Sequence, residues 1–166
     1  MIKMILCSDI NGGIGFHNDL LYNIKEDMRF FKETTTGHKI VMGYNTWLSL
    51  PKKPLPNREN YVLYDGPEDI EGAEKLKSIQ DVVELAKQDD IFIIGGAMVY
   101  NQFISLDLVD EVYLTYVYDK HYSANKSVNL IEMSKKLKHR EFIKEIEYSD
   151  RRGPISVHVY RYYKSV

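Results

Sequence analysis

Four consecutive apolar residues, Ile91 to Ile94, run directly into Gly95-Gly96 and then into the segment Ala97 to Tyr100. A short, wholly apolar run of this kind indicates a strand that is buried on both faces, as in a parallel sheet covered by helices. Two glycines permit a tight turn into a helix, where backbone N–H groups can approach a pyrophosphate closely. Alone the pair is a weak signal, because strand-to-helix turns use it anyway. The feature therefore favours an α/β fold.

Strands and helices are predicted to alternate along the rest of the chain. Strand patterns occupy residues 1–8, 39–43, 60–64 and 111–118, and the end reads as a hairpin of 142–148 and 155–163. This order predicts a single-domain α/β fold over residues 1–166. Its core is a mixed, mostly parallel central β-sheet with flanking helices on both faces and a C-terminal antiparallel hairpin. Ligands of such sheets bind at the carboxyl ends of the strands.

Helices are predicted for residues 23–32, 44–50, 78–90 and 132–141. Asn23 is a suitable N-cap, and Glu26 three residues later can complete a capping box. Ser78 can cap the third helix in the same way. The last helix mixes acids, bases and apolar residues, which indicates a solvated face and not a nucleic-acid patch.

The first of these helices carries an acid on its apolar side. At helical spacing Ile24, Met28 and Phe31 form one stripe, and Asp27 falls inside it. An inward carboxylate needs a partner, because burying it unpaired costs several kcal/mol or raises its pKa. The structural alternative is an acid near the helix start, held at the edge of the core by the helix dipole.

Loops that carry candidate functional residues lie near these elements. Gly12, Gly13 and Gly15 make the segment before the acid-bearing helix a turn or a mobile loop, and hence a candidate lid. Thr46 at a helix start after a strand suits an anion. Arg58 ends a proline-stiffened loop, where it is either part of a rigid surface connection or a fixed partner for a carboxylate.

Composition excludes several classes of protein. The net charge of −2 gives no field for nucleic acid or an anionic membrane. A single cysteine, Cys7, rules out a disulfide framework, and we expect it to be a small buried hydrophobe. The five histidines are scattered without ligand spacing, so no metal site is expected. No leader or spanning segment is present, and we expect a cytoplasmic protein.

Ordered motifs along nearly the whole chain resemble dihydrofolate reductase. They are Ile14-Gly15, the helix with Asp27 and Phe31, M-G-Y-N-T-W at 42–47, P-L-P-N-R at 54–58, I-G-G-A-M-V-Y at 94–100 and Y-L-T at 113–115. No single motif is decisive, but the set in register is hard to obtain by chance. The resemblance implies a monomer that reduces 7,8-dihydrofolate to tetrahydrofolate for one-carbon and thymidylate metabolism. It implies no nucleic-acid or membrane partner, and it places the protein in the class of antifolate targets.

The resemblance also assigns residues to the substrate. Asp27, assisted by Thr115, would accept hydrogen bonds from the pterin ring and favour the protonated form of the ring nitrogen, while a water supplies the proton. Arg58 would pair with the carboxylate of the glutamate tail. The other implied substrate residues are Ile5, Cys7, Met28, Phe31, Leu50, Leu55 and Ile94. Tyr22 and Leu20 join Asp27 in the implied catalytic set, and residues 11–21 would be the lid.

A reduced nicotinamide dinucleotide is the implied cofactor, with NADPH expected and NADH as the alternative. Gly43, Thr46, Gly95, Gly96 and Tyr100 would hold it. The remaining implied cofactor residues are Cys7, Ile14, Gly15, Tyr44, Asn45, Tyr64, Asp65, Lys77, Ile94, Ala97, Met98 and Val99.

Several positions depart from the family's pattern. Leu21-Tyr22 stands where the family usually has Pro-Trp, and Tyr44 stands where many members place an arginine over the 2′-phosphate of the cofactor. Asp65 would repel a phosphate but could accept a bond from a ribose hydroxyl, as in NAD sites, and Lys77 could compensate. The family's acidic motif is missing around residues 123–129, which bears on lid closure.

Three rival interpretations stay open at this point. A related reductase of riboflavin synthesis shares the fold and the cofactor, although Asp27 and the absence of a deaminase domain argue against it. A non-catalytic folate or nucleotide binder would explain the altered cofactor residues. A structural protein with the same fold is the third, since a fold alone does not fix a function.

Overall fold

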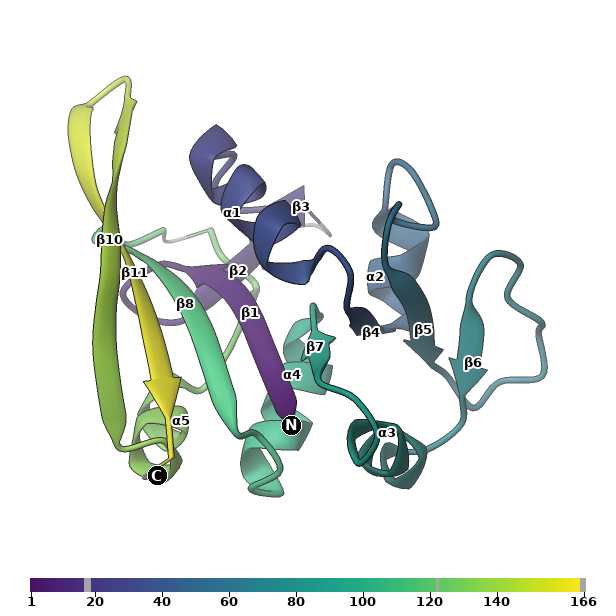
Figure 1. Cartoon of the computed structure of the whole chain (residues 1–166). Coiled ribbons are helices and arrows are strands. Elements are labelled where there is room, and N and C mark those ends of the chain that lie inside the picture. The colour runs from purple at the N-terminus through teal and green to yellow at the C-terminus, as the bar shows by residue number, and fades with distance from the viewer. Residues whose placement is uncertain (17–18, 122, 165–166) are drawn as a thin grey trace.

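A central sheet organises the chain in the computed structural model, which describes residues 1–16, 19–121 and 123–164. Within this described part, its eight strands are β1 (Ile2–Ser8), β4 (Lys39–Gly43), β5 (Glu59–Leu63), β6 (Glu74–Leu76), β7 (Ile91–Ile93), β8 (Glu111–Val117), β10 (His139–Asp150) and β11 (Gly153–Tyr163). Their spatial order is β10-β11-β8-β1-β7-β4-β5-β6 (Figure 1).

The sheet is mostly parallel. β1 pairs in parallel with β7 and β8, and β4 pairs in parallel with β5 and β7. The antiparallel pairs of this sheet in the described residues are those of β11 with β8 and with β10. The predicted fold class is therefore confirmed, including the C-terminal antiparallel hairpin. The short edge strand β6 was not predicted, because its three residues are too few to show a period.

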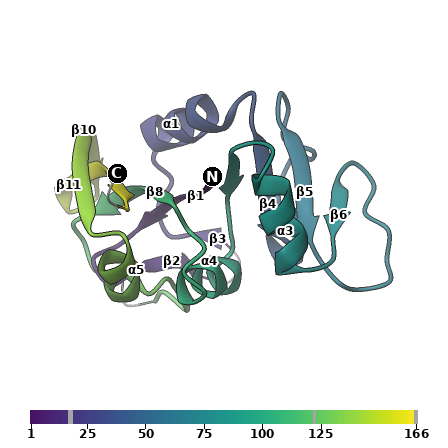
Figure 2. The same ribbon diagram turned by 60° about the horizontal axis from the view of Figure 1, so that its bottom comes forward.

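Helices cover both faces of the sheet. One face carries α1 (Lys25–Thr35) and α2 (Tyr44–Ser49), and the other carries α3 (Ile79–Ala86), α4 (Ala97–Ser105) and α5 (Leu130–Lys136). Figure 2 shows α1 on one side of the sheet with α4 and α5 on the other. The alternation of side chains along β1 explains this arrangement, since Met4 and Leu6 pack with α4 while Ile5 packs on the α1 side.

A small second sheet joins two loop regions. It consists of β3 (Asp19–Leu20), β2 (Gly13–Phe16) and β9 (Lys126–Ser127). Part of the predicted loop at residues 11–15 is thus a strand, because its backbone finds partners far along the chain, which local composition cannot show. His17 and Asn18 of the predicted lid lie outside the described residues.

Several predicted helix ends are wrong. The N-cap of α1 is Ile24, with no side-chain cap, so the capping box of Asn23 and Glu26 does not form. The helix predicted for residues 132–141 ends at Lys136, and His139 already belongs to β10, where it pairs with Tyr163. Strand pairing overrides local helical pattern there. The predicted cap at Ser78 is confirmed, since its side chain accepts from the Asp81 N–H, although α3 ends at Ala86 and not near residue 90.

Among the described residues, no helix combines the length and the apolar character that crossing a membrane requires.

Candidate active site

Asp27 lies at the centre of a small polar cluster on the α1 face of the sheet. Its carboxylate accepts a hydrogen bond from the Thr115 hydroxyl at 2.5 Å and another from the Cys7 thiol. Cys7 and Thr115 are register partners across β1 and β8, so both side chains project to the same face. Thr115 is buried, and Asp27 and Cys7 are partly buried. The inward acid predicted from the sequence therefore has two partners on the sheet.

Burial governs the acidity of this cluster. Desolvation raises the pKa of Asp27 above its ordinary 3.8, while the bonds from Thr115 and Cys7 and the charge of Lys144 oppose that rise. Burial, with the nearby charge of Asp27, also raises the pKa of the Cys7 thiol well above its usual range. Cys7 is consequently a neutral thiol and not an activated nucleophile. It is partly buried beside a carboxylate, whereas the sequence predicted a buried hydrophobe. Lys144 was not singled out from the sequence, since it comes from β10 and no local pattern marks it.

Apolar side chains surround the acid. Five predicted substrate residues belong to one cluster between the sheet, α1 and α2, namely Ile5, Phe31, Leu50, Leu55 and Ile94. Met28 is different, because its side chain is 55% exposed and does not continue the inward stripe of Ile24. Met28 therefore faces solvent, whereas Phe31 further along α1 packs against the sheet.

Arg58 lies at the far end of α1. Its Nη1 donates to the Thr35 hydroxyl at 3.1 Å, its Nε donates to the Pro56 carbonyl at 2.9 Å, and the guanidinium lies 5.9 Å from the centre of the Phe31 ring. Burial lowers its pKa. The side chain is held in place by neutral partners, which leaves its charge available for an anion.

The glycine turns meet on the same edge of the sheet. The Gly43 N–H donates to the Gly95 carbonyl at 2.9 Å, which joins the ends of β4 and β7. A Cβ added at Gly95, whose φ is +140°, would lie 3.1 Å from the Thr46 hydroxyl, and one at Gly96 would lie 3.3 Å from it. One at Gly43 would lie 3.0 Å from a Val99 methyl. The structure thus brings together Gly43, Thr46, Gly95 and Gly96, as the sequence predicted.

Other predicted cofactor residues flank this turn in different ways. Val99 and Tyr100 face the core, and the Tyr100 hydroxyl donates to the Ile5 carbonyl at 2.8 Å. Met98 and Asn45 are exposed, and Ala97 is half-buried. Ile14 and Gly15 lie in β2, where Ile14 packs against the core under α4.

Tyr44 and Tyr64 form a stacked pair beyond the turn. Their ring centres are 4.1 Å apart, and the Tyr64 hydroxyl donates to the Glu68 carboxylate. This bond raises the pKa of Tyr64 to about 12. Lys75 lies near the Tyr64 ring and donates to the Gly66 and Glu68 carbonyls. Asp65 and Lys77 are exposed.

Tyr22 is held in place by residues that are distant from it in the sequence. Its hydroxyl donates to the Asp119 carboxylate at 3.0 Å, and Asp119 in turn accepts two bonds from Arg152 at the tip of the β10–β11 hairpin. Leu20, the third predicted catalytic residue, is 72% exposed. Asp119 and Arg152 are far from Tyr22 in sequence, and no local pattern links them.

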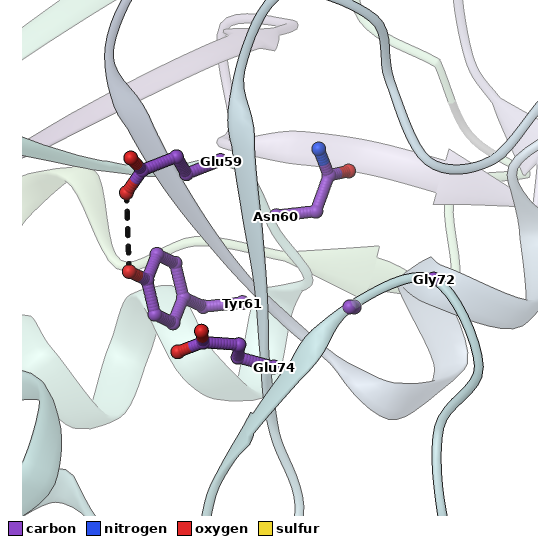
Figure 3. A pocket seen from close by; sticks show the side chains of 6 residues that line it. Glu59, Asn60, Tyr61, Gly72 and Glu74 are labelled. Carbon is purple, nitrogen blue, oxygen red and sulfur yellow. Dashed lines mark hydrogen bonds between the residues drawn. The ribbon is translucent and has the colours of Figure 1, made fainter.

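A separate shallow hollow lies at the opposite edge of the sheet. With a volume of about 530 Å³, it is lined by Glu59, Asn60, Tyr61, Gly72, Ala73 and Glu74 (Figure 3). The Tyr61 hydroxyl donates to Glu59 at 3.2 Å. These residues stand at the amino end of β5, whereas ligands of such sheets bind at the carboxyl ends. In the described ranges, no group of His, Cys, Asp or Glu side chains is arranged to hold a metal ion.

The fold and the site together define a class of protein. A sheet covered on both faces carries one acid among apolar side chains, and beside it lies a glycine turn suited to a dinucleotide. A family model described as dihydrofolate reductase matches residues 1–163. The chain belongs to the dihydrofolate reductase family.

Individual relatives agree with this assignment. The dihydrofolate reductase of Ureaplasma parvum is 44% identical over 108 residues, which span 63% of this chain and 69% of the relative. That of Bacillus subtilis is 34% identical over 129 residues, covering 74% of this chain and 75% of the relative. A solved structure of the Enterococcus faecalis dihydrofolate reductase, complexed with NADP(H) and RAB-propyl, superposes with a TM-score of 0.80 at 22% identity. It covers 100% of this chain and 97% of that chain.

Proposed function

We propose that the chain reduces 7,8-dihydrofolate to 5,6,7,8-tetrahydrofolate with NADPH, in support of one-carbon and thymidylate metabolism. One observation carries the proposal. Asp27 is the acid at the centre of a cluster whose other members are neutral donors and apolar side chains, and this cluster lies on the same side of the sheet as Arg58. A planar heterocycle with an N–H and an amino group, attached to an acidic tail, matches that distribution of charge.

Asp27 has two parts in this mechanism. Its carboxylate accepts hydrogen bonds from the ring N–H and the amino group and so fixes the register of the ring. Its negative charge also stabilises the cationic form of the ring nitrogen that must gain a proton. Thr115 and Cys7 hold the carboxylate in place. Burial raises the pKa of Asp27 above its ordinary value, while the bonds from Thr115 and Cys7 favour the charged form.

The remaining substrate contacts are assigned by position. Ile5, Phe31, Leu50, Leu55 and Ile94 would enclose the ring and the aromatic middle of the substrate, and they exclude water from the reacting atoms. Arg58 would bind the tail carboxylate with its guanidinium.

The glycine turn fits a dinucleotide. Side chains at Gly43, Gly95 or Gly96 would occupy the space over the Thr46 hydroxyl and Val99, so their absence lets backbone N–H groups approach a pyrophosphate. When bound, the reduced nicotinamide supplies the hydride. The stacked Tyr44 and Tyr64 would face its adenosine end. Lys77 is exposed and follows Leu76, whose carbonyl accepts from the Tyr64 N–H, and it is the cation that we assign to the 2′-phosphate.

We extend the proposal to the setting of the enzyme. Residues 1–166 would form one domain that acts as a cytoplasmic monomer, with small molecules and neither nucleic acid nor membrane as partners. Size-exclusion chromatography with light scattering would test the monomer, and a second species at working concentrations would contradict it.

The test follows loss of reduced-nicotinamide absorbance with dihydrofolate, with NADPH and NADH run in parallel. We expect turnover with NADPH to exceed turnover with NADH. Faster turnover with NADH would reject Lys77 as the phosphate partner and make Asp65 the specificity residue. A folded protein that binds the cofactor but turns over with neither would be a binding protein. Turnover of a ribosylamino-pyrimidine instead of dihydrofolate would indicate the riboflavin-type reductase.

A further inference from the structure

Asp119 is an unusual meeting point of three segments. Its carbonyl accepts from the Ile10 N–H at 3.0 Å, and its carboxylate accepts from the Tyr22 hydroxyl at 3.0 Å. The same carboxylate receives both terminal nitrogens of Arg152, Nη1 at 3.0 Å and Nη2 at 2.8 Å. Arg152 Nη2 also donates to Asp150 at 2.7 Å, which braces the guanidinium within the tip of its own hairpin. Because the planar guanidinium pairs with the carboxylate through two hydrogen bonds, this contact fixes the relative orientation of the two groups as well as the distance between them.

Tyr22 connects this network to the candidate active site. It packs against the same apolar cluster as Cys7, whose thiol donates to Asp27. Its ring also meets His121 edge-on, with ring centres 6.2 Å apart, and Tyr148 of the hairpin at 6.4 Å. Because the phenol donates to Asp119, its hydrogen is committed to that partner.

We infer that Arg152 and Asp119 are positioning residues that fix Tyr22 at the edge of the substrate site. The side chain of Asp119 is only 15% exposed, so without Arg152 it would be a poorly hydrated carboxylate that has lost the two hydrogen bonds from the guanidinium. The Asp119 loop would then shift toward water, and Tyr22 would follow it. The role presupposes the proposed reductase activity, and it concerns substrate and not cofactor, because Tyr22 lies on the Asp27 side of the sheet.

The chain offers a matched control in the same turn. Arg151 is exposed, next to Arg152, and has no hydrogen-bond or ion-pair partner among the described residues. Arg151→Gln and Arg152→Gln remove the same charge at the same tip. We expect Arg152→Gln to raise the KM for dihydrofolate about threefold to fivefold, a size set by the 61% exposure of Arg152. The KM of Arg152→Gln for NADPH should stay within about twofold of wild type, and so should both KM values of Arg151→Gln. Equal effects of the two substitutions, or an equal rise in both KM values, would overturn the inference.

A double-substitution cycle tests whether the effect passes through Tyr22. Tyr22→Phe keeps the ring and removes the hydroxyl that Asp119 accepts. In the Tyr22→Phe background, Arg152→Gln should change the KM for dihydrofolate by no more than about a further 1.5-fold, because the hydrogen bond from Tyr22 to Asp119 is already absent. If the effects of the two substitutions on the KM for dihydrofolate were fully additive, Arg152 would not act through Tyr22. Arg152→Lys should rescue only in part, since an ammonium cannot form the two-pronged contact.

Hydrogen exchange supplies a readout that does not depend on turnover. The Ile10 amide donates to the Asp119 carbonyl, so Arg152→Gln should speed its exchange about threefold to fivefold while Arg151→Gln leaves it unchanged. If the wild-type protein shows no turnover but the amide responds, the proposed function fails while the positioning network stands. If turnover is normal and neither the amide nor the KM responds, the network has no positioning role.

Discussion

The two ends of the candidate site are built in different ways. At the Asp27 end, the polar groups are paired with each other across α1, β1 and β8, and apolar side chains enclose them. At the Tyr44–Tyr64 end, the rings stack near exposed acids, and the Tyr64 hydroxyl is bound to Glu68. The first arrangement restricts what can replace each residue, because a lost partner leaves a buried polar group unsatisfied. The second tolerates change, since water can solvate whatever is altered. Under the proposed function, the chemistry is therefore fixed at one end, and cofactor preference is adjustable at the other.

The largest effect is expected at the enclosed end. Asp27→Asn keeps the size and the acceptor oxygen for Thr115 but removes the negative charge that stabilises the protonated ring. We expect hydride transfer near neutral pH to fall by about 100-fold or more, with cofactor binding retained. Pre-steady-state absorbance measurements would isolate this step. Unchanged hydride transfer in a folded variant would remove Asp27 from the mechanism.

Gly95→Ala should have the next largest effect. A methyl group there would lie 3.1 Å from the Thr46 hydroxyl, on a backbone with φ of +140°. We expect a cost of about 1–3 kcal/mol in unfolding free energy and at least about a tenfold weaker affinity for NADPH, measured by denaturation and by calorimetry.

Gly37→Ala is the control for that substitution. Gly37 also has a positive φ, +83°, but nothing lies within 4 Å of the added methyl. It should lose about 1–2 kcal/mol of stability without any loss of cofactor affinity. An equal loss of affinity in both variants would mean that Gly95 acts only through the stability of the fold.

A smaller effect is expected at the open end. Tyr44→Arg places a guanidinium beside Tyr64, and we expect it to raise the ratio of NADPH to NADH turnover about fivefold. Ser49→Arg adds the same charge at the other end of α2 and should leave the ratio unchanged. A rise in both variants would attribute the change to overall charge and would break the contrast between the two ends.

The smallest effect concerns stability and pH. Because burial raises the pKa of Asp27 in the folded chain above 3.8, the folded state binds this proton more tightly than the unfolded state does. The stabilising contribution is complete below pH 3.8 and is lost as pH rises through the raised pKa. The urea midpoint of Asp27→Asn should therefore exceed that of wild type at neutral pH and converge with it in acid.

An exposed acid provides the reference for that measurement. Asp69→Asn removes the same charge from a solvated position, where water compensates for it. Its midpoint should stay close to that of wild type at both pH values. If Asp27→Asn were instead less stable than wild type at neutral pH, the carboxylate would be stabilising the fold through its partners.

Sequence reasoning succeeded where local pattern decides the structure. The apolar runs of β1, β4 and β7 and the turns at Gly43 and Gly95 are local features, and they were predicted almost to the residue. The capping box failed, because tertiary packing buried Ile24 and moved the helix start past Asn23. The prediction that Met28 belongs to the inward stripe is wrong, because helical spacing alone cannot show which side chains of the stripe find partners in the tertiary structure. The Tyr22–Asp119–Arg152 network was missed because contacts between distant segments have no signature in a single sequence.

The position of β1 has a consequence for how the chain acquires its structure. This strand is made before both of its partners, β7 and β8, because Ile2 pairs with Ile91 and Lys3 pairs with Glu111. Pairing across such separations must meet the entropy of closing long loops before any contact compensates for it. This apolar strand therefore has no partner in the central sheet until β7 has been made, and during that interval it is exposed to aggregation.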